Sequence, residues 1–448
     1  MTIIEHVDMG LPASFVWDYH DRRPRLSRLY EKSKVSQWNA STDLDWSIEV
    51  DPGTLPEVAG LAAVDWGADG PLDALVKEHP ELLGDVVANM HAWLVSQFMH
   101  GEQGALVATA KIGAAAESID DKYYAAAQVA DEARHVEAYQ RYLDKIEMEY
   151  PISGPLHELL SDVMRHRHVD LTFLGMQILV EGVALAAFSL GGFFLANPLI
   201  ARITELVRRD EARHVAFGVL SLQGHYDDMD PIDLAEREEF LLEACALMRD
   251  RFVPTQVWER FGIDAATASK AFANSPDMVA FRSLMFSKVV PNLRKLGLLT
   301  PRVREGFEQL GILRYERYVD SATEAGELEP GDGAADNGEA GREDPLAAMR
   351  VALATVEHIP PEPVLMVLAG LTDSRGMAEA PPATVRLLVS GVDAGDWLLD
   401  IGPAGLSYRP DDPASPADVE LSTDIGTWSD IVAARSTPPE ALFKGKVT

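Results

Sequence analysis

A duplicated pentapeptide constrains the fold of this chain more than any other feature of its sequence. The letters DEARH occur at residues 131–135 and again at 210–214, an offset of 79 residues. In each copy Glu and His stand at positions i and i+3, which share one face of a helix. The same offset relates Glu102 to Glu181, and each lies 30 residues before the Glu of its own copy. The repeat therefore predicts two equivalent halves, each made of two helices.

Helix-start signals fall at the midpoint of each half. Ser118, or an aspartate shortly after it, is an N-cap candidate, and Asn197 followed by Pro198 is a strong start signal. Folding each half back at its midpoint gives an antiparallel helix pair. Its two glutamates are then level, about 22 Å from the turn at ~1.5 Å rise per residue. Two such pairs, related by an approximate two-fold axis, form a four-helix bundle.

The centre of this bundle would receive Glu from two helices and Glu-x-x-His from the other two. The six side chains are Glu102, Glu132, His135, Glu181, Glu211 and His214. This is the ligand set of a carboxylate-bridged di-iron or di-manganese site. Its charge would balance two divalent ions, whereas four carboxylates without metal would repel and take up protons. The alternative is that these residues lie on solvated helix faces. The metal site is favoured because the motif occurs in two equally spaced copies inside apolar helices.

The chain divides into four parts by pattern. Residues 1–79 are mixed in character and are predicted to form an extension that packs on the bundle. Residues 80–319 have apolar positions at three- and four-residue spacing, which predicts helices. Residues 320–344 are acidic with almost no apolar side chains, which predicts a flexible linker. Residues 345–448 are predicted to form a separate α+β domain.

The elements expected within these parts give a mainly α fold class. Helices are expected near 80–117, 119–149, 155–195 with an interruption, 198–226 and 231–253, with shorter ones to about 318. In the last part TVRLLVSG, DWLLDIG, GLSYRP and ADVELST are partly alternating runs, which predict an antiparallel sheet. Helical segments are expected beside it at 345–358 and 424–434. The prediction is a four-helix bundle with extra helices plus a small C-terminal α+β domain.

Composition excludes several classes of function. Acidic residues outnumber basic ones 71 to 39, a net charge of −32, which opposes binding to nucleic acid. The single cysteine, Cys245, excludes a disulfide framework and a zinc site built from several thiolates. The N-terminus lacks signal-peptide character, and the most apolar stretch, 176–196, contains Glu181, so no membrane span is expected. We therefore expect a soluble, cytoplasmic protein.

The duplicated motif resembles that of the ferritin-like superfamily. The likeness is to the branch of ribonucleotide reductase small subunits, acyl carrier protein desaturases and multicomponent monooxygenase hydroxylases, and it covers roughly residues 80–320. It implies two Fe ions (or Mn/Fe), O2 as co-substrate, an electron donor such as a ferredoxin or reductase, and a homodimer. It also implies that Asp131 and Asp210 each orient a metal-bound His from the opposite motif. Arg134 and Arg213 could then pair with those carboxylates.

Three positions bear on the choice among these activities. Tyr139 has the spacing of the radical-bearing tyrosine of reductase small subunits. Leu185 stands where multicomponent hydroxylases carry Thr, and Val207 where arylamine N-oxygenases carry a third His. Apolar neighbours of the glutamates predict a dry pocket for an apolar substrate. Its expected walls are Ala105, Leu106, Thr109, Ile178, Leu185 and Phe188.

The C-terminal part resembles the sterol carrier protein type 2 family. The likeness runs from Thr384 to Val447 and includes the closing FKGKV at 443–447. It implies either a tunnel for a lipid or acyl chain or a module for docking and dimerisation. The predicted function is an O2-activating non-haem di-iron oxygenase that hydroxylates an apolar or carrier-bound organic substrate or otherwise inserts oxygen into it. The alternatives are an amine N-oxygenase or desaturase, a reductase-like radical protein, and a non-catalytic metal- and lipid-binding protein.

Overall fold

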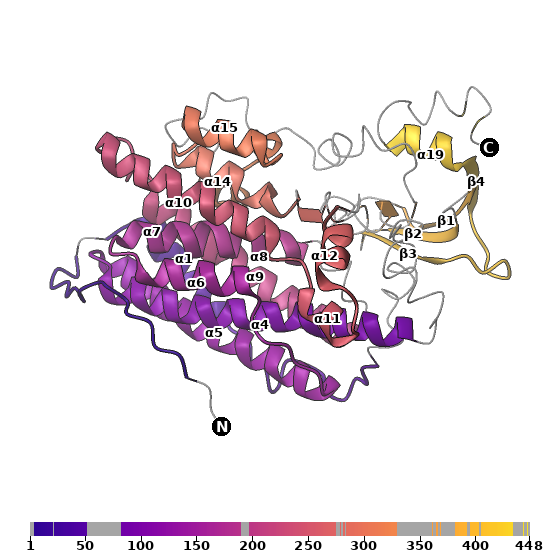
Figure 1. The fold of residues 1–448 in the computed structure, drawn as a ribbon, viewed down its shortest axis with the longest axis horizontal. Coiled ribbons are helices and arrows are strands. Elements are labelled where there is room, and N and C mark those ends of the chain that lie inside the picture. The colour runs from indigo at the N-terminus through magenta and orange to yellow at the C-terminus, as the bar shows by residue number, and fades with distance from the viewer. Residues whose placement is uncertain are drawn as a thin grey trace.

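The protein is a mainly helical bundle with a small C-terminal sheet and helix (Figure 1). The computed structural model describes residues 4–20, 22–51, 82–189, 197–274, 281–282, 284–328, 381–391, 395–402 and 405–432, with single positions 278, 361, 364, 365, 368, 442 and 446. The expected segments 345–358 and 443–447 therefore lie almost wholly outside the described residues. The likeness of the C-terminal part to sterol carrier proteins stays a prediction.

Four helical segments carry the duplicated residues. They are α4 (Leu83–Ala115), α5 (Ile119–Ile146), α8 (Glu181–Ser189) and α9 (Pro198–Leu222). The Ser118 side chain accepts a hydrogen bond from the backbone N–H of Asp121 at 3.4 Å, and that of Asn197 accepts from Leu199 at 2.9 Å. Both are N-cap bonds that satisfy free donors of the first turn. The predicted helix starts at the two midpoints are confirmed.

The segment expected to be an interrupted helix at 155–195 consists of several pieces. They are α6 (Gly154–Arg165), α7 (Val169–Phe173), the π-helix η3 (Leu174–Val180) and then α8. The π-helix widens the turn that ends at Glu181, and such turns occur frequently at functional sites. Gly218 of α9 allows η3 to approach, because a Cβ there would lie 2.5 Å from Cβ of Gln177. The close approach brings Glu181 toward α9.

One described segment, Val169–Phe188, is long and apolar enough to cross a membrane by length and composition. The share of its most apolar window that is buried inside the protein is 94%. Other helices cover it.

The remaining helices are α1 (Pro24–Val35), α10 (Pro231–Asp250), α11 (Thr255–Arg260), α12 (Ala265–Asn274), α14 (Val290–Lys295), α15 (Pro301–Gln309) and α16 (Ser321–Glu324), with 3₁₀ turns η5 (Met285–Lys288) and η6 (Leu313–Tyr315).

The helical body extends past the point where the flexible linker was expected to begin. Asp320 caps α16 by accepting a hydrogen bond from the N–H of Thr323 at 2.9 Å. Leu328 is buried in the main core, and the buried Glu327 pairs with Lys32. Residues 320–328 therefore pack with the helices, and the rest of the predicted linker lies outside the described residues.

The C-terminal sheet has the strand order β3-β2-β1-β4. Its elements are β1 (Ala383–Ser390), β2 (Asp396–Gly402), β3 (Gly405–Pro410) and β4 (Val419–Asp424), followed by α19 (Ile425–Val432). The prediction of a purely antiparallel sheet was wrong, because β4 pairs in parallel with β1. The connection 411–418 carries the chain back along β1 before β4 begins. Arg386 holds this connection, since it donates to Asp411 at 2.9 Å and to the carbonyl of Ser415 at 2.6 Å.

Candidate metal centre

The bundle brings all six sequence-predicted residues into one buried cluster. Each of the six side chains belongs to a residue that is at most 4% exposed. Their ligand atoms form two overlapping groups, each within 4.8 Å: Glu102, Glu132, His135 and Glu211, and Glu132, Glu181, Glu211 and His214. Glu132 and Glu211 belong to both groups. This is the arrangement expected when two carboxylates bridge two ions and the other two glutamates each bind one.

One ring nitrogen of His135 faces the carboxylates and the other faces an aspartate of the opposite motif. Nδ1 lies 3.2 Å from Glu102 Oε2 and 3.3 Å from Glu211 Oε1. Nε2 lies 3.1 Å from Asp210 Oδ2. An N–H that Nε2 donates to this carboxylate leaves the Nδ1 lone pair free for a metal.

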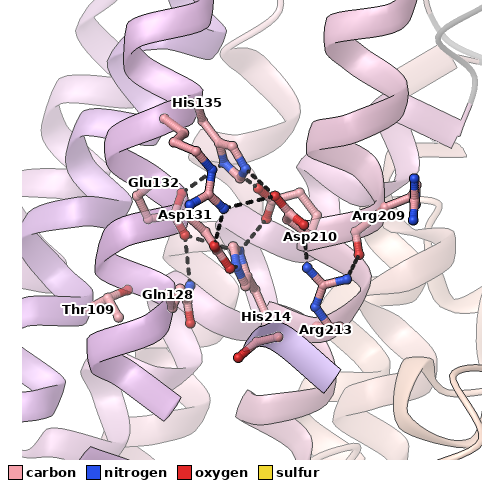
Figure 2. Close-up of polar contacts among 12 residues, drawn as sticks. Thr109, Gln128, Asp131, Glu132, His135, Arg209, Asp210, Arg213 and His214 are labelled. Atoms are coloured by element: carbon pink, nitrogen blue, oxygen red, sulfur yellow. Dashed lines mark hydrogen bonds and ion pairs between the residues drawn. The ribbon is translucent and has the colours of Figure 1, made fainter. Parts of the chain in front are cut away.

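His214 makes the equivalent contacts from the second motif, and Figure 2 shows the two histidines among these side chains. Its Nδ1 lies 3.1 Å from Glu132 Oε1, and its Nε2 lies 3.3 Å from Asp131 Oδ2. Each aspartate therefore contacts the histidine of the other motif, as the resemblance implied. Arg134 binds Asp131 and Arg213 binds Asp210, so both predicted arginine pairs are also present.

Two residues of the N-terminal extension complete the support of the histidines, and the sequence analysis did not identify them. Trp38 Nε1 donates to Asp210 Oδ2 at 2.8 Å, and Gln37 Nε2 donates to Asp131 Oδ1 at 2.9 Å. The Trp38 ring also stacks on His135, with centroids 6.2 Å apart and planes 17° apart. Because these residues lie about a hundred positions before the first motif, no local pattern connected them with it.

Gln128 is a third residue that the sequence analysis missed. Its Nε2 donates to Glu132 Oε1 at 2.9 Å and lies 3.4 Å from Glu181 Oε1. It stands four residues before Glu132 on the same helical face, and this spacing could have identified it. The buried amide therefore contacts one glutamate that belongs to both ligand groups and one that belongs to a single group.

The protonation of the cluster fits a site that exchanges protons for metal ions. Burial raises the pKa of Glu102 and of Glu181 well above the usual range. Burial opposes the charged form of Glu132 as well, but the neighbouring histidines outweigh it and lower its pKa. The nearby carboxylates likewise outweigh burial and hold the pKa of His135 and of His214 far above the usual value. Metal ions would replace this buried positive charge and the bound protons.

Two carboxylate oxygens in the cluster have lone pairs available to a cation. Glu132 Oε2 and Glu211 Oε1 are buried and accept no hydrogen bond from the residues that the structure describes. Buried carboxylate oxygens without such a bond are costly, and metal coordination would satisfy them. The donor set of oxygens and imidazole nitrogens therefore fits two iron or manganese ions.

A small pocket opens on the cluster from one side. Its lining residues are Phe98, Gly101, Glu102, Ala105, Val180, Glu181, Ala184, Phe188 and Arg251. They come from α4, from η3 and α8, and from Arg251, the residue that follows α10, and none belongs to α5 or α9. The pocket therefore reaches Glu102 and Glu181, the two glutamates that belong to only one ligand group each, and no residue of the Glu-x-x-His helices lines it.

The predicted pocket walls are only partly correct. Ala105 and Phe188 line the pocket, but Ile178, Leu185, Leu106 and Thr109 do not. The π-helix changes the direction of the residues around it, and Ile178 there faces Gly218 of α9 instead. Arg251 was not predicted, because it lies far along the chain from either glutamate.

Residues 110–297 match the family described as p-aminobenzoate N-oxygenase AurF. The match covers less than half of the chain and includes five of the six cluster residues, since Glu102 precedes it. The helical fold, the buried carboxylate and histidine cluster and this match define a di-metal oxidoreductase. Within that class, the similarity in sequence is to the AurF N-oxygenases.

Solved structures that resemble the chain include R2-like ligand-binding oxidases. A variant with an aerobically reconstituted Mn/Fe cofactor is 16% identical, with a TM-score of 0.36, over 68% of this chain and 96% of that one. The oxidase from Sulfolobus acidocaldarius is 19% identical, with a TM-score of 0.35, over 57% of this chain and 89% of that one. No curated protein matches the chain.

Proposed function

We propose that this protein is an O2-dependent di-iron oxygenase that inserts oxygen at the nitrogen of an organic amine. The observation that carries the proposal is the pair of overlapping ligand groups that share Glu132 and Glu211. The match to the AurF family over 110–297 favours nitrogen over carbon as the atom oxidised. Val207 stands where a third histidine is expected in arylamine N-oxygenases, so the ions would have two imidazoles between them.

The six buried residues would hold the two ions. Glu102, His135 and the two shared glutamates face one position, and Glu181, His214 and the same glutamates face the other. When bound, two ferrous ions reduce O2 with electrons from an external donor, such as a ferredoxin or a reductase. The four carboxylates carry the charge that balances two divalent ions, which permits burial of the whole assembly.

The chain's own side chains would orient the ligands and exclude water. Asp131 and Asp210 hold each imidazole by Nε2 with Nδ1 directed at the metals. The aromatic rings of Phe98 and Phe188, 4.9 Å apart and edge to face, wall the pocket beside Glu102. An apolar wall at this place protects a strongly oxidising centre from water and positions the substrate beside it.

The overall reaction is balanced as a mono-oxygenation. A primary amine, O2, two electrons and two protons give an N-hydroxylamine and water, so nitrogen is oxidised while one oxygen atom is reduced to water. Iron-loaded, chemically reduced protein should consume O2 with an aromatic amine and incorporate one atom of ¹⁸O2 into the product, measured by mass spectrometry.

The location of the label separates the candidate functions. Label on nitrogen supports the proposal, and label on a carbon atom would return the assignment to a hydroxylase. If the reduced protein consumes no O2 with any amine, the remaining candidate function is a metal-binding protein without turnover. Glu211→Ala, which removes a shared carboxylate, is the control for oxidation by free iron.

A further inference from the structure

The first helix, α1, is strongly basic although the protein as a whole is acidic. Residues 22–34 contain six basic side chains and one acidic side chain, whereas the whole chain has a net charge of −32. Three of the basic residues, Arg28, Lys32 and Lys34, are exposed, and we call them the basic face of α1. Val35, the last residue of the helix, is 84% exposed beside them. A local field of this sign attracts acidic partners.

The helix lies over the two Glu-x-x-His helices. Arg23, at its N-terminal end, donates to Asp121 of α5 at 3.0 Å and to the carbonyl of Leu220 of α9 at 2.6 Å. Just past its C-terminal end, Gln37 donates to Asp131 of α5 at 2.9 Å. The helix therefore runs beside the part of α5 that leads from its first turn to the metal centre.

Few residues separate the metal centre from solvent on this side of the protein. His214 Nε2 lies 3.3 Å from Asp131 Oδ2, and Gln37, which binds that aspartate, is exposed. Electron transfer between proteins slows steeply with distance, so a donor that serves a buried centre must dock where its cover is thin. No residue of α1 lines the pocket, so a protein docked on α1 leaves the pocket free for substrate.

Part of the basic charge is used inside the protein and part is available to a partner. Lys32 pairs with the buried Glu327, and Lys34 pairs with the exposed Glu31 at 2.7 Å. Arg28 has no acidic partner among the residues that the structure describes. Charges farther away than about 8 Å are largely screened at physiological ionic strength. The acidic remainder of the surface therefore does not cancel the field over α1.

The charge distribution favours a small acidic protein over a membrane or a nucleic acid. A basic helix that binds a lipid surface inserts its apolar face. Leu26 and Leu29, on the apolar face of α1, are at most 1% exposed and belong to the main core. A nucleic acid carries phosphates well past a single helix, where they would meet the acidic surface around it.

We propose that the basic face of α1 is the docking surface for an acidic electron-donor protein of the ferredoxin type. The proposal rests on the proposed function, which needs two external electrons for each substrate molecule. Two reduced ferredoxins each give one electron as their [2Fe–2S] clusters are oxidised, and two ferric ions of the centre are reduced to ferrous. Opposite charges steer the encounter, so it weakens as salt is added.

The test measures binding of an oxidised, acidic [2Fe–2S] ferredoxin to the metal-loaded protein by titration calorimetry. The salt concentrations are about 0.1 M and 1 M, where the Debye length is about 10 Å and 3 Å. The double variant Arg28→Glu/Lys34→Glu should bind about 10-fold more weakly than the wild type at the lower salt, and the difference should disappear at the higher salt. Metal content and melting temperature are determined for every variant.

A second double variant, Lys270→Glu/Arg302→Glu, is the matched control. These exposed residues belong to α12 and α15, which lie apart from α1 (Figure 1). Their replacement changes the net charge equally and should keep wild-type affinity. Equal weakening in both double variants overturns the proposal, and so does a wild type that does not bind the ferredoxin. Binding through α1 to phosphatidylserine vesicles or duplex DNA, but not to the ferredoxin, also overturns it.

An anaerobic measurement separates this proposal from the proposed function. Reduced ferredoxin should reduce the diferric protein without amine or O2, and the α1 double variant should slow this step about 10-fold. Reduction by dithionite should stay unchanged in that variant. If ferredoxin docks and reduces the protein but no amine elicits O2 uptake, the proposed function alone is refuted. If dithionite supports N-oxygenation but ferredoxin does not bind, the docking proposal alone is refuted.

Discussion

Replacement of Trp38 by Phe tests whether the N-terminal extension is part of the metal centre. The change removes the N–H that donates to Asp210 at 2.8 Å, while Asp210 keeps its contact with His135 at 3.1 Å. A hydrogen bond to a charged group contributes about 1.5–3 kcal/mol. Loss of a group that orients a metal-ligating histidine typically weakens metal binding about 10- to 100-fold. Tenfold in affinity corresponds to about 1.4 kcal/mol, so the two magnitudes agree.

The measurement is competition of each variant with a chromophoric chelator for Fe²⁺ under anaerobic conditions. Trp46 of the same extension is the matched control, because its indole donates to the backbone carbonyl of Ala40 at 2.7 Å. Trp46→Phe also loses one indole hydrogen bond and a similar volume, and it should bind metal as the wild type does. Equal losses of affinity in both variants would refute the reasoning, and so would unchanged affinity in Trp38→Phe.

Three further predictions concern the cluster. Purified protein should contain about two transition-metal ions per chain, and the Glu132→Ala variant should contain at least one fewer. Full metal occupancy in a Glu102/Glu181 double alanine variant would contradict the ligand set. Burial raises the folded-state pKa of Glu102 and Glu181, so the folded protein without metal holds protons that the unfolded chain releases. Its melting temperature should therefore decrease as the pH is raised from ~6 to ~8. A rise over that interval would contradict the protonated cluster. Tyr139→Phe should keep O2 consumption, and a persistent tyrosyl radical in the wild type that this variant lacks would restore the radical-protein alternative.

The parts of the site that the sequence predicts are those encoded at short range. The Glu-x-x-His pattern needs only the period of a helix, and the exact repeat relates the second half to the first. Ser118 and Asn197 mark the helix starts because capping is a local interaction. The same local information gives the four strands of the C-terminal sheet. It does not give their order, because the parallel pairing of β4 with β1 depends on where the connection 411–418 crosses.

The parts that the sequence does not predict come from distant segments. Trp38 reaches Asp210 across 172 positions, and neither residue has a neighbour pattern that points to the other. Arg251 enters the pocket from the end of α10, where a lone arginine reads as an ordinary surface charge. The π-helix at Leu174–Val180 has no distinctive composition, yet it decides which residues around Glu181 face the pocket. In each case tertiary packing determines the role.

The duplication also explains why the histidines and the pocket belong to different helices of the centre. The Glu-x-x-His helices α5 and α9 bring both histidines together, and Gln37 and Trp38 cover the aspartates behind them. The single-glutamate helices α4 and α8 lie on the other side, and the pocket opens between them. The pocket reaches Glu102 and Glu181 but neither histidine. The approximate two-fold axis makes the two metal positions similar, so the asymmetry needed to orient a substrate must come from outside the repeat. Arg251, which lines the pocket and has no counterpart in the duplicated motif, makes the surroundings of the two positions unequal.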